Sequence, residues 1–184
     1  MKKIIITVPK GIDYVSDWEQ FKLFEFPHIL NKKLTGCGFT QYALTCNYNV
    51  ILCSPRRILL ENKVDWYKEL KKKGGELSYD LLYARNDYET ALGVDKDLTV
   101  AKPVPLSKIN VSDADRKNFL KQFKQKVCDF ANDCSSRGKF CKILVTYDSY
   151  KKVKDALTSI GLFDKFYTIV DEMQSIFYRC HIQE

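Results

Sequence analysis

The amino-acid sequence predicts an α/β fold with a mainly parallel central sheet that is covered by helices on both sides. Two observations support this fold class. Short apolar runs of strand length alternate with amphipathic segments of helix length along most of the chain. Glycines and prolines separate these segments, for example at Pro55, Gly74, Gly138 and Gly161. Strands that alternate with helices form parallel sheets, because each helix carries the chain back to the start of the next strand.

The segments predicted to form strands each contain a short apolar run. They are Ile4–Val8, His28–Asn31, Asn49–Ser54, Tyr79–Ala84, Lys142–Tyr147 and Phe166–Val170. Asn49–Ser54 is a continuous apolar run between polar flanks, which is typical of a strand that is buried on both faces. Such a strand belongs in the middle of a parallel sheet.

The segments between these strands have the apolar spacing of helices. In Arg57–Lys73, apolar residues recur at intervals of three or four, and cations followed by glycine mark the end. Other helices are expected at Thr40–Cys46, from Ser112 towards Gly138, and from a cap at Asp148 or Ser149 to Gly161, with a helical turn around Trp18–Leu23. Residues 84–111 are polar, contain two prolines and are expected to form a loop or an insertion.

The composition is that of one globular domain over residues 1–184. No apolar run approaches the roughly 20 residues that span a bilayer, so no membrane partner is expected. Seven cysteines without a CxxC pair favour reduced thiols and a cytoplasmic location. Because the two histidines also lie far apart in the sequence, we expect no structural zinc. The net charge of +7 mildly favours a polyanionic partner.

The segment NKKLTGCGFTQYAL has the outline of a phosphate-binding loop. Gly36 and Gly38 allow consecutive backbone N–H groups to point into one concavity, and the hydroxyl of Thr40 can ligate magnesium. Phe39 stands where such loops carry a lysine. Turns with two glycines between a strand and a helix are common, so this segment alone does not identify a nucleotide site.

An acidic pair follows the last predicted strand. Asp171 can hold magnesium through water, and Glu172 can orient or deprotonate an attacking water. Ligands of parallel α/β sheets bind at the carboxyl ends of strands, where both this pair and the glycine turn lie. Strands often end in Asp or Glu, so the pair is also weak evidence by itself.

Four motifs in order resemble those of the first motor domain of superfamily-two (DEAD/DEAH-like) helicases. LTGCGFT is similar to their phosphate loop, and CSPRRILLENK is similar to the next motif, which touches the nucleic-acid backbone. VTYDSYKKV resembles the strand before the acidic box, and VDEMQ resembles the DExx box itself. The resemblance spans Asn31 to Phe177, and it implies a RecA-like P-loop three-layer sandwich with a mainly parallel central sheet, incomplete at the C-terminus.

This resemblance also implies an ATP site with a magnesium ion. The residues that would line the phosphates are Thr35, Gly36, Cys37, Gly38, Phe39 and Thr40. Asp171 and Thr40 would hold the magnesium through water and nucleotide, and Glu172 would be the catalytic carboxylate.

The resemblance further implies DNA or RNA as a partner. Arg56 and Arg57 would contact its backbone, although a solvated helix start explains both arginines equally well. Gln174 would couple the nucleotide to a second RecA-like domain, which the family needs and which we expect another polypeptide or a longer chain to supply.

Phe39 is the main departure from the family, because it cannot place a charge on the outer phosphates. The leading expectation is the nucleic-acid-dependent ATPase half of a DEAD-like helicase or translocase, inactive alone. Two alternatives stay open. One is a non-hydrolysing P-loop-derived module that binds nucleic acid or a protein partner. The other is a different parallel α/β fold, such as a flavodoxin-like fold, with chance motif matches, and strand order would distinguish it.

Overall fold

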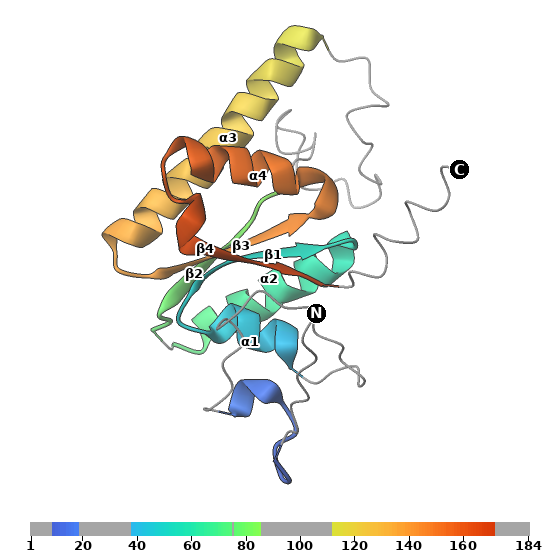
Figure 1. Cartoon of the computed structure of the whole chain (residues 1–184), viewed down its shortest axis with the longest axis vertical. Coiled ribbons are helices and arrows are strands. Elements are labelled where there is room, and N and C mark those ends of the chain that lie inside the picture. Colours follow the sequence, from blue (N-terminus) through green and yellow to red (C-terminus); the bar gives the residue numbers. More distant parts are fainter. Residues whose placement is uncertain (1–8, 19–37, 75, 86–111, 172–184) are drawn as a thin grey trace, which may run out of the picture.

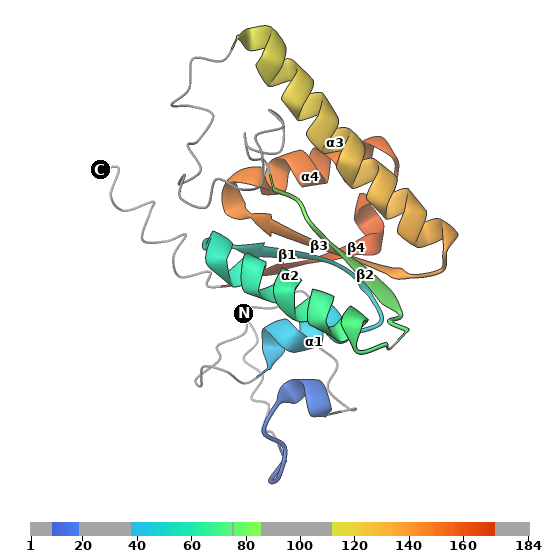
Figure 2. The same ribbon diagram turned by 180° about the vertical axis from the view of Figure 1, so that it is seen from behind.

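The computed structural model describes residues 9–18, 38–74, 76–85 and 112–171. These residues form a parallel sheet between two layers of helices, so the predicted α/β sandwich is confirmed and is consistent with a RecA-like fold (Figure 1). Helices α1 (Phe39–Thr45) and α2 (Arg57–Lys72) lie on one face, and α3 (Asp113–Ser136) and α4 (Tyr147–Ser159) on the other (Figures 1 and 2). Short 3₁₀ turns, η1 (Val15–Asp17) and η4 (Phe163–Lys165), precede α1 and the last described strand.

The described sheet has four parallel strands in the order β2-β3-β1-β4. They are β1 (Asn49–Ser54), β2 (Tyr79–Tyr83), β3 (Phe140–Thr146) and β4 (Phe166–Val170). β1 pairs with β4, which comes three strands later among the described strands. The flavodoxin-like order 2-1-3-4-5 contains no such pair, since its neighbours are at most two strands apart along the chain. The strand order therefore excludes the flavodoxin-like alternative.

Alternate residues of the central strands supply two separate apolar cores. On β1, Ile51 and Cys53 pack with α3 and α4, whereas Val50 and Leu52 pack with α1 and α2. All four side chains are buried. This two-sided burial explains why the strand reads as a continuous apolar run rather than as an alternating one.

Several boundaries agree with the sequence. β1 and β4 occupy their predicted ranges, and α2 begins at the predicted Arg57. α3 begins after Ser112, whose hydroxyl accepts a hydrogen bond from the Asp115 backbone N–H at 3.1 Å, as a helix N-cap should. The prediction fails at the junction of β3 and α4. The strand is Phe140–Thr146 and passes straight into the helix, so Thr146 takes the cap position predicted for Asp148 or Ser149.

Some predicted elements lie outside the described residues. They are the strands Ile4–Val8 and His28–Asn31, residues 86–111 of the predicted loop, and all but Trp18 of the turn Trp18–Leu23.

A fully buried lysine fastens α1 to the sheet. Lys142 lies in the middle of β3, and its amino group donates hydrogen bonds to the carbonyls of Ala43 at 3.3 Å, Cys46 at 2.7 Å and Tyr48. These carbonyls belong to the last turn of α1 and the residues after it, which have no partner within the helix. Burial lowers the pKa of the Lys142 amino group, and the nearby Cys46 thiol opposes this shift. The three hydrogen bonds fix the end of α1 on the sheet. The start of α1 therefore lies toward the carboxyl edge of the sheet.

A buried carboxylate joins three elements at the amino edge of the sheet. Asp80 accepts hydrogen bonds from the Tyr67 hydroxyl at 2.6 Å and the Lys71 amino group at 2.9 Å, and it pairs with Arg137 at 2.9 Å. Its side chain is only 5% exposed. Burial alone would raise the pKa of Asp80, but the hydrogen bonds from Tyr67 and Lys71 and the charges of Lys71 and Arg137 hold it below its usual value. This network ties α2 and the end of α3 to β2.

Candidate functional site

Two residues that the sequence assigns to one site do meet at the carboxyl edge of the sheet. The hydroxyl of Thr40, in the first turn of α1, donates a hydrogen bond to Oδ2 of Asp171 at 3.4 Å. Asp171 directly follows β4, and 131 positions separate the two residues along the chain. Of the residues assigned to the glycine turn and the acidic box, the structure therefore brings Thr40 and Asp171 together.

The backbone before Thr40 requires a glycine. Gly38 caps α1 with φ 83° and ψ 6°, a left-handed conformation that other residues adopt only with strain. Its carbonyl accepts the first hydrogen bond of the helix, from the Tyr42 N–H at 2.8 Å. The turn thus delivers Thr40 to the edge of the sheet within two residues of Gly38.

Phe39, at the position of the missing lysine, has a packing role. It packs on the buried Val15 of η1, next to Tyr42 and Ile169, and is itself partly buried. Ile169 comes from β4, so this small cluster joins η1, α1 and β4. A phenylalanine here contributes apolar contact where a lysine would contribute charge.

Asp171 is held in place through its backbone. Its N–H donates a hydrogen bond to the carbonyl of Cys53 at 2.9 Å, which continues the pairing of β4 with β1. Its carbonyl accepts a hydrogen bond from the hydroxyl of Tyr147, the first residue of α4. Because β1 lies between β3 and β4, Tyr147 reaches across one strand to make this contact. Tyr147 carried no signal of a site residue in the sequence, since only the strand order places it near Asp171.

The donor atoms of this pair suit magnesium. A hydroxyl and a carboxylate are hard oxygen ligands, and magnesium commonly takes one or two protein oxygens and fills its other positions with water and phosphate. Among the described residues no group of three or more His, Cys, Asp or Glu side chains could hold a metal ion on its own. Thr40 and Asp171 would therefore hold magnesium only together with a phosphate ligand and water.

Arginines follow β1, the strand next to β4, at the same edge. Arg56 is the exposed cap of α2 and Arg57 its first, partly exposed residue, so both lie where β1 delivers the chain to the helix. The backbone N–H of Arg56 donates to the Ser54 hydroxyl at 3.5 Å, the limit of a hydrogen bond. This geometry fits the predicted role of both arginines at the carboxyl edge.

A third arginine, which was not predicted as a site residue, lies near the start of the same helix. Arg85, which follows β2, forms an ion pair with Glu61 of α2 at 3.3 Å. Burial raises the pKa of the neighbouring Tyr83 hydroxyl, the charge of Glu61 adds to this shift, and the charges of Arg85 and Arg57 oppose it. Glu61 lies one turn of α2 after Arg57, so the ion pair brings Arg85 near the start of α2. The sequence carried no signal for Arg85 beyond its position at the end of a predicted strand.

The remaining predicted site residues lie outside the described part of the chain. They are Thr35, Gly36 and Cys37 of the glycine turn, the predicted catalytic Glu172, and Gln174.

The five cysteines that the structure describes are all free, and Cys46 and Cys53 are buried as small core residues. No described helix is both long and apolar enough to cross a membrane.

Comparison of the chain with protein-family models, with curated proteins and with solved structures finds no match in any of the three. The case for a function therefore rests on the residues at the carboxyl edge.

Proposed function

We propose that this chain is the nucleotide-binding half of a nucleic-acid-dependent ATPase of the DEAD-like helicase or translocase type, with ATP and magnesium as ligands. A second RecA-like domain would complete it and supply the groups that hydrolysis requires. The thiols of the described residues are free and largely buried, which favours the cytoplasm as its location.

The hydrogen bond between Thr40 and Asp171 is the observation that carries this proposal. A hydroxyl from the start of one helix and a carboxylate from the end of a parallel strand need not meet in a chance α/β fold. Their meeting at the carboxyl edge, where such sheets bind ligands, supports a magnesium–phosphate site there. Arg56, Arg57 and Arg85 at the same edge support a polyanion such as DNA or RNA as the second ligand.

The first test is thermal melting with millimolar Mg-ATP. A ligand at about 100 times its dissociation constant adds about 2.7 kcal/mol to the free energy of unfolding. For a chain of this size that corresponds to a rise of roughly 5–10 °C in Tm. We expect Asp171→Asn to abolish the rise, because the amide cannot balance the charge of the ion.

Asp148→Asn is the matched control. Asp148 is an exposed carboxylate in the first turn of α4, so its loss should leave the rise intact. A wild-type chain whose Tm does not respond to Mg-ATP would contradict the nucleotide part of the proposal.

A second candidate function is a P-loop-derived module that binds nucleic acid or a protein without hydrolysing ATP. The packing of Phe39 on Val15 favours it, because the side chain at the position of the expected lysine is used inside the fold. In such a module the site would keep its backbone geometry without its mobile charge.

Phe39→Lys distinguishes the two functions. We expect the variant to lose about 1–2 kcal/mol of stability, because a partly buried aromatic contact is lost. If Mg-ATP raises the Tm of Phe39→Lys but not that of wild type, the chain is a disabled nucleotide site and the second function holds. Equal responses of the two proteins would show that binding does not depend on a lysine here. Phe39→Leu, which keeps an apolar side chain, controls for the loss of packing.

A further inference from the structure

The first half of α3 projects beyond the sheet. The helix has 24 residues and is therefore about 36 Å long, whereas the seven residues of β3 span about 23 Å. Its buried residues, Phe123, Val127, Ala131 and Cys134, all come after the first ten residues of the helix, while Ser112 to Asn118 are exposed without exception. Figures 1 and 2 show the start of α3 extending past the strands. The start of this helix is not needed to cover the core.

This projecting half carries a cluster of cations, Arg116, Lys117 and Lys121, which we call the α3 basic arm. All three side chains are exposed. Within the described part of the chain, none of them forms an ion pair with a carboxylate, in contrast to Lys68 with Asp65. Lys117 and Lys121 are four residues apart, so they repel each other on one helix face and lower helix stability by a few tenths of a kcal/mol, about 0.2–0.5. Asp113 lies three residues before Arg116 and four before Lys117, close enough on the helix to offset this repulsion, but within the described residues neither cation forms an ion pair with it.

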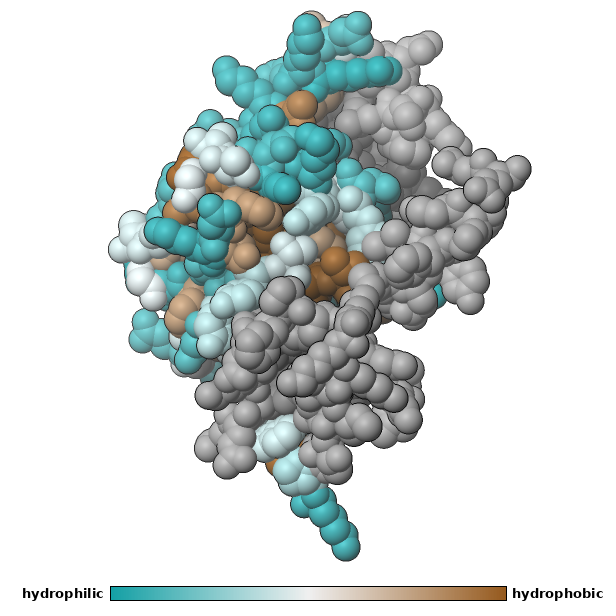
Figure 3. Space-filling view, viewed as in Figure 1, coloured by the Kyte–Doolittle hydropathy of each residue, from teal (hydrophilic) through white to brown (hydrophobic). Residues whose placement is uncertain are grey.

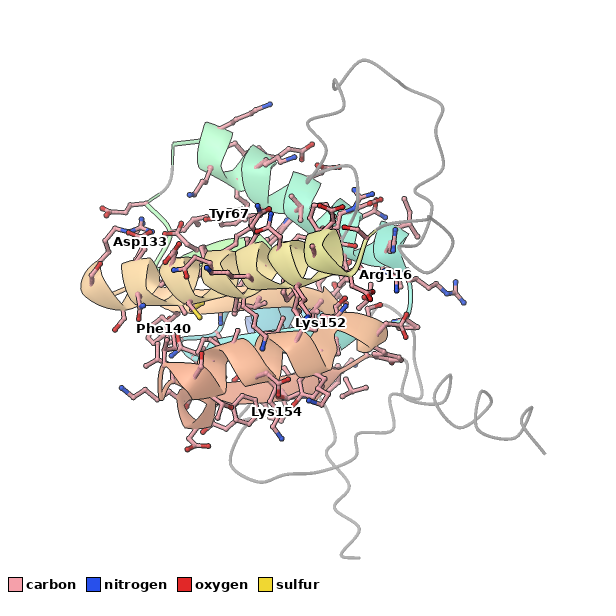
Figure 4. All side chains as sticks on the ribbon, turned by 90° about the horizontal axis from the view of Figure 1, so that it is seen from above. Tyr67, Arg116, Asp133, Phe140, Lys152 and Lys154 are labelled. Atoms are coloured by element: carbon pink, nitrogen blue, oxygen red, sulfur yellow. The ribbon has the colours of Figure 1, made fainter. Side chains whose placement is uncertain are left out.

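The α3 basic arm lies at the same edge of the sheet as the arginines of the candidate site. β3 follows α3 and runs back along it, so the start of α3 lies at the carboxyl ends of the strands. α2, with Arg56 and Arg57, begins on the same side of the molecule (Figures 1 and 2). Figure 4 shows Arg116 at this end of α3, and Figure 3 shows hydrophilic residues gathered where the helix projects. Cations that follow β1 and β2, together with those at the start of α3, thus border one edge.

We propose that the α3 basic arm binds the phosphate backbone of a single strand of nucleic acid that also contacts Arg56 and Arg57. The inference rests on the nucleic-acid part of the proposed function and not on its nucleotide site. Contacts to phosphates need only exposed cations along the path of the strand, and they require neither a pocket nor base recognition. The arm has this form, and the net charge of +7 acts in the same direction.

The test measures binding of the full chain to fluorescent oligothymidylate and oligouridylate of about 20 nucleotides without ATP, over a range of salt concentrations. The arm variant is Arg116→Gln, Lys117→Gln and Lys121→Gln combined. The control variant is Lys72→Gln, Lys73→Gln and Lys165→Gln combined, which removes the same charge from exposed residues at the amino edge. Both variants change only exposed side chains, so their melting temperatures should match that of wild type.

We expect the arm variant to bind at least about 10-fold more weakly at low salt. Its slope of log affinity against log salt should fall in magnitude by about 2, since each lost single-strand phosphate contact accounts for about 0.7. The control should keep the wild-type slope. Equal slopes for the two variants would overturn the role of the arm while leaving nucleic-acid binding in place. A wild-type chain that binds neither oligonucleotide would overturn both, and binding of an acidic peptide such as polyglutamate in its place would point to a protein partner.

Discussion

Replacing Lys142 with methionine is expected to lower the free energy of unfolding by about 3 kcal/mol, the largest effect of any single substitution considered. Methionine has nearly the length of lysine but donates no hydrogen bond, so the carbonyls of Ala43, Cys46 and Tyr48 lose their shared donor. A buried acceptor left without a partner costs about 1–3 kcal/mol. Removing a buried charge returns part of that cost, which keeps the sum near 3 rather than above it. Urea denaturation at neutral pH measures the change.

The matched control for this substitution is Lys165→Met. Lys165 is exposed in η4, and its replacement should change stability by no more than about 0.5 kcal/mol. Because Lys142 fixes the end of α1 and Thr40 lies near its start, Lys142→Met should also weaken any stabilisation by Mg-ATP. A change below about 1 kcal/mol would mean that the desolvation of the amino group offsets its three hydrogen bonds.

Replacing Asp80 with asparagine is expected to lower stability by about 2–3 kcal/mol at neutral pH. Lys71 and Arg137 lose a charged partner, but both side chains are about half exposed and can turn to water, which limits the cost. Asp133→Asn is the control, since Asp133 pairs with the same Arg137 from an exposed position. Exposed ion pairs contribute about 0–1 kcal/mol, so the control should stay close to wild type.

The Asp80 network also predicts how stability depends on pH. The pKa of Asp80 is lower in the folded chain than its usual 3.8, so the unfolded chain binds the proton more tightly. The contribution of Asp80 is therefore complete above pH 4, approximately the unfolded pKa, and is lost as the pH falls through the folded pKa. The gap in stability between wild type and Asp80→Asn should be widest at pH 7 and narrow at about pH 3. A gap that is constant with pH would contradict this account.

Local patterns predicted most of the described fold because each element carries its own signal. Asn49–Ser54 is apolar throughout and forms a central strand, and Ser112 with acids after it begins a helix. Lys142 shows the limit of such patterns. Its charge suggests a solvated end of a strand, yet its partners lie 94 to 99 positions away in sequence and exist only when α1 has packed on the sheet.

The residues of the candidate site also fall into two groups, those that the sequence predicts and those that only the fold reveals. Thr40 and Asp171 could be found because a known order of motifs brings them together, and the structure brings them within hydrogen-bond distance. Tyr147 and Arg85 could not, because their roles depend on which strands are neighbours. Sequence spacing gives the ends of strands, whereas strand order decides which of these ends are neighbours.

The backbone hydrogen bond from Asp171 to Cys53 has a mechanical consequence. Asp171 cannot slide along the axis of β4 without stretching this bond or pulling the end of β1 with it. Only Ser54 and Pro55 separate Cys53 from Arg56. A displacement of the end of β1 is therefore transmitted to the start of α2 through a short, stiff stretch of chain. An ion bound to Asp171 and a polymer bound to Arg56 would therefore both act on the hydrogen bond between Asp171 and Cys53. Communication between the two ligands would need no moving domain.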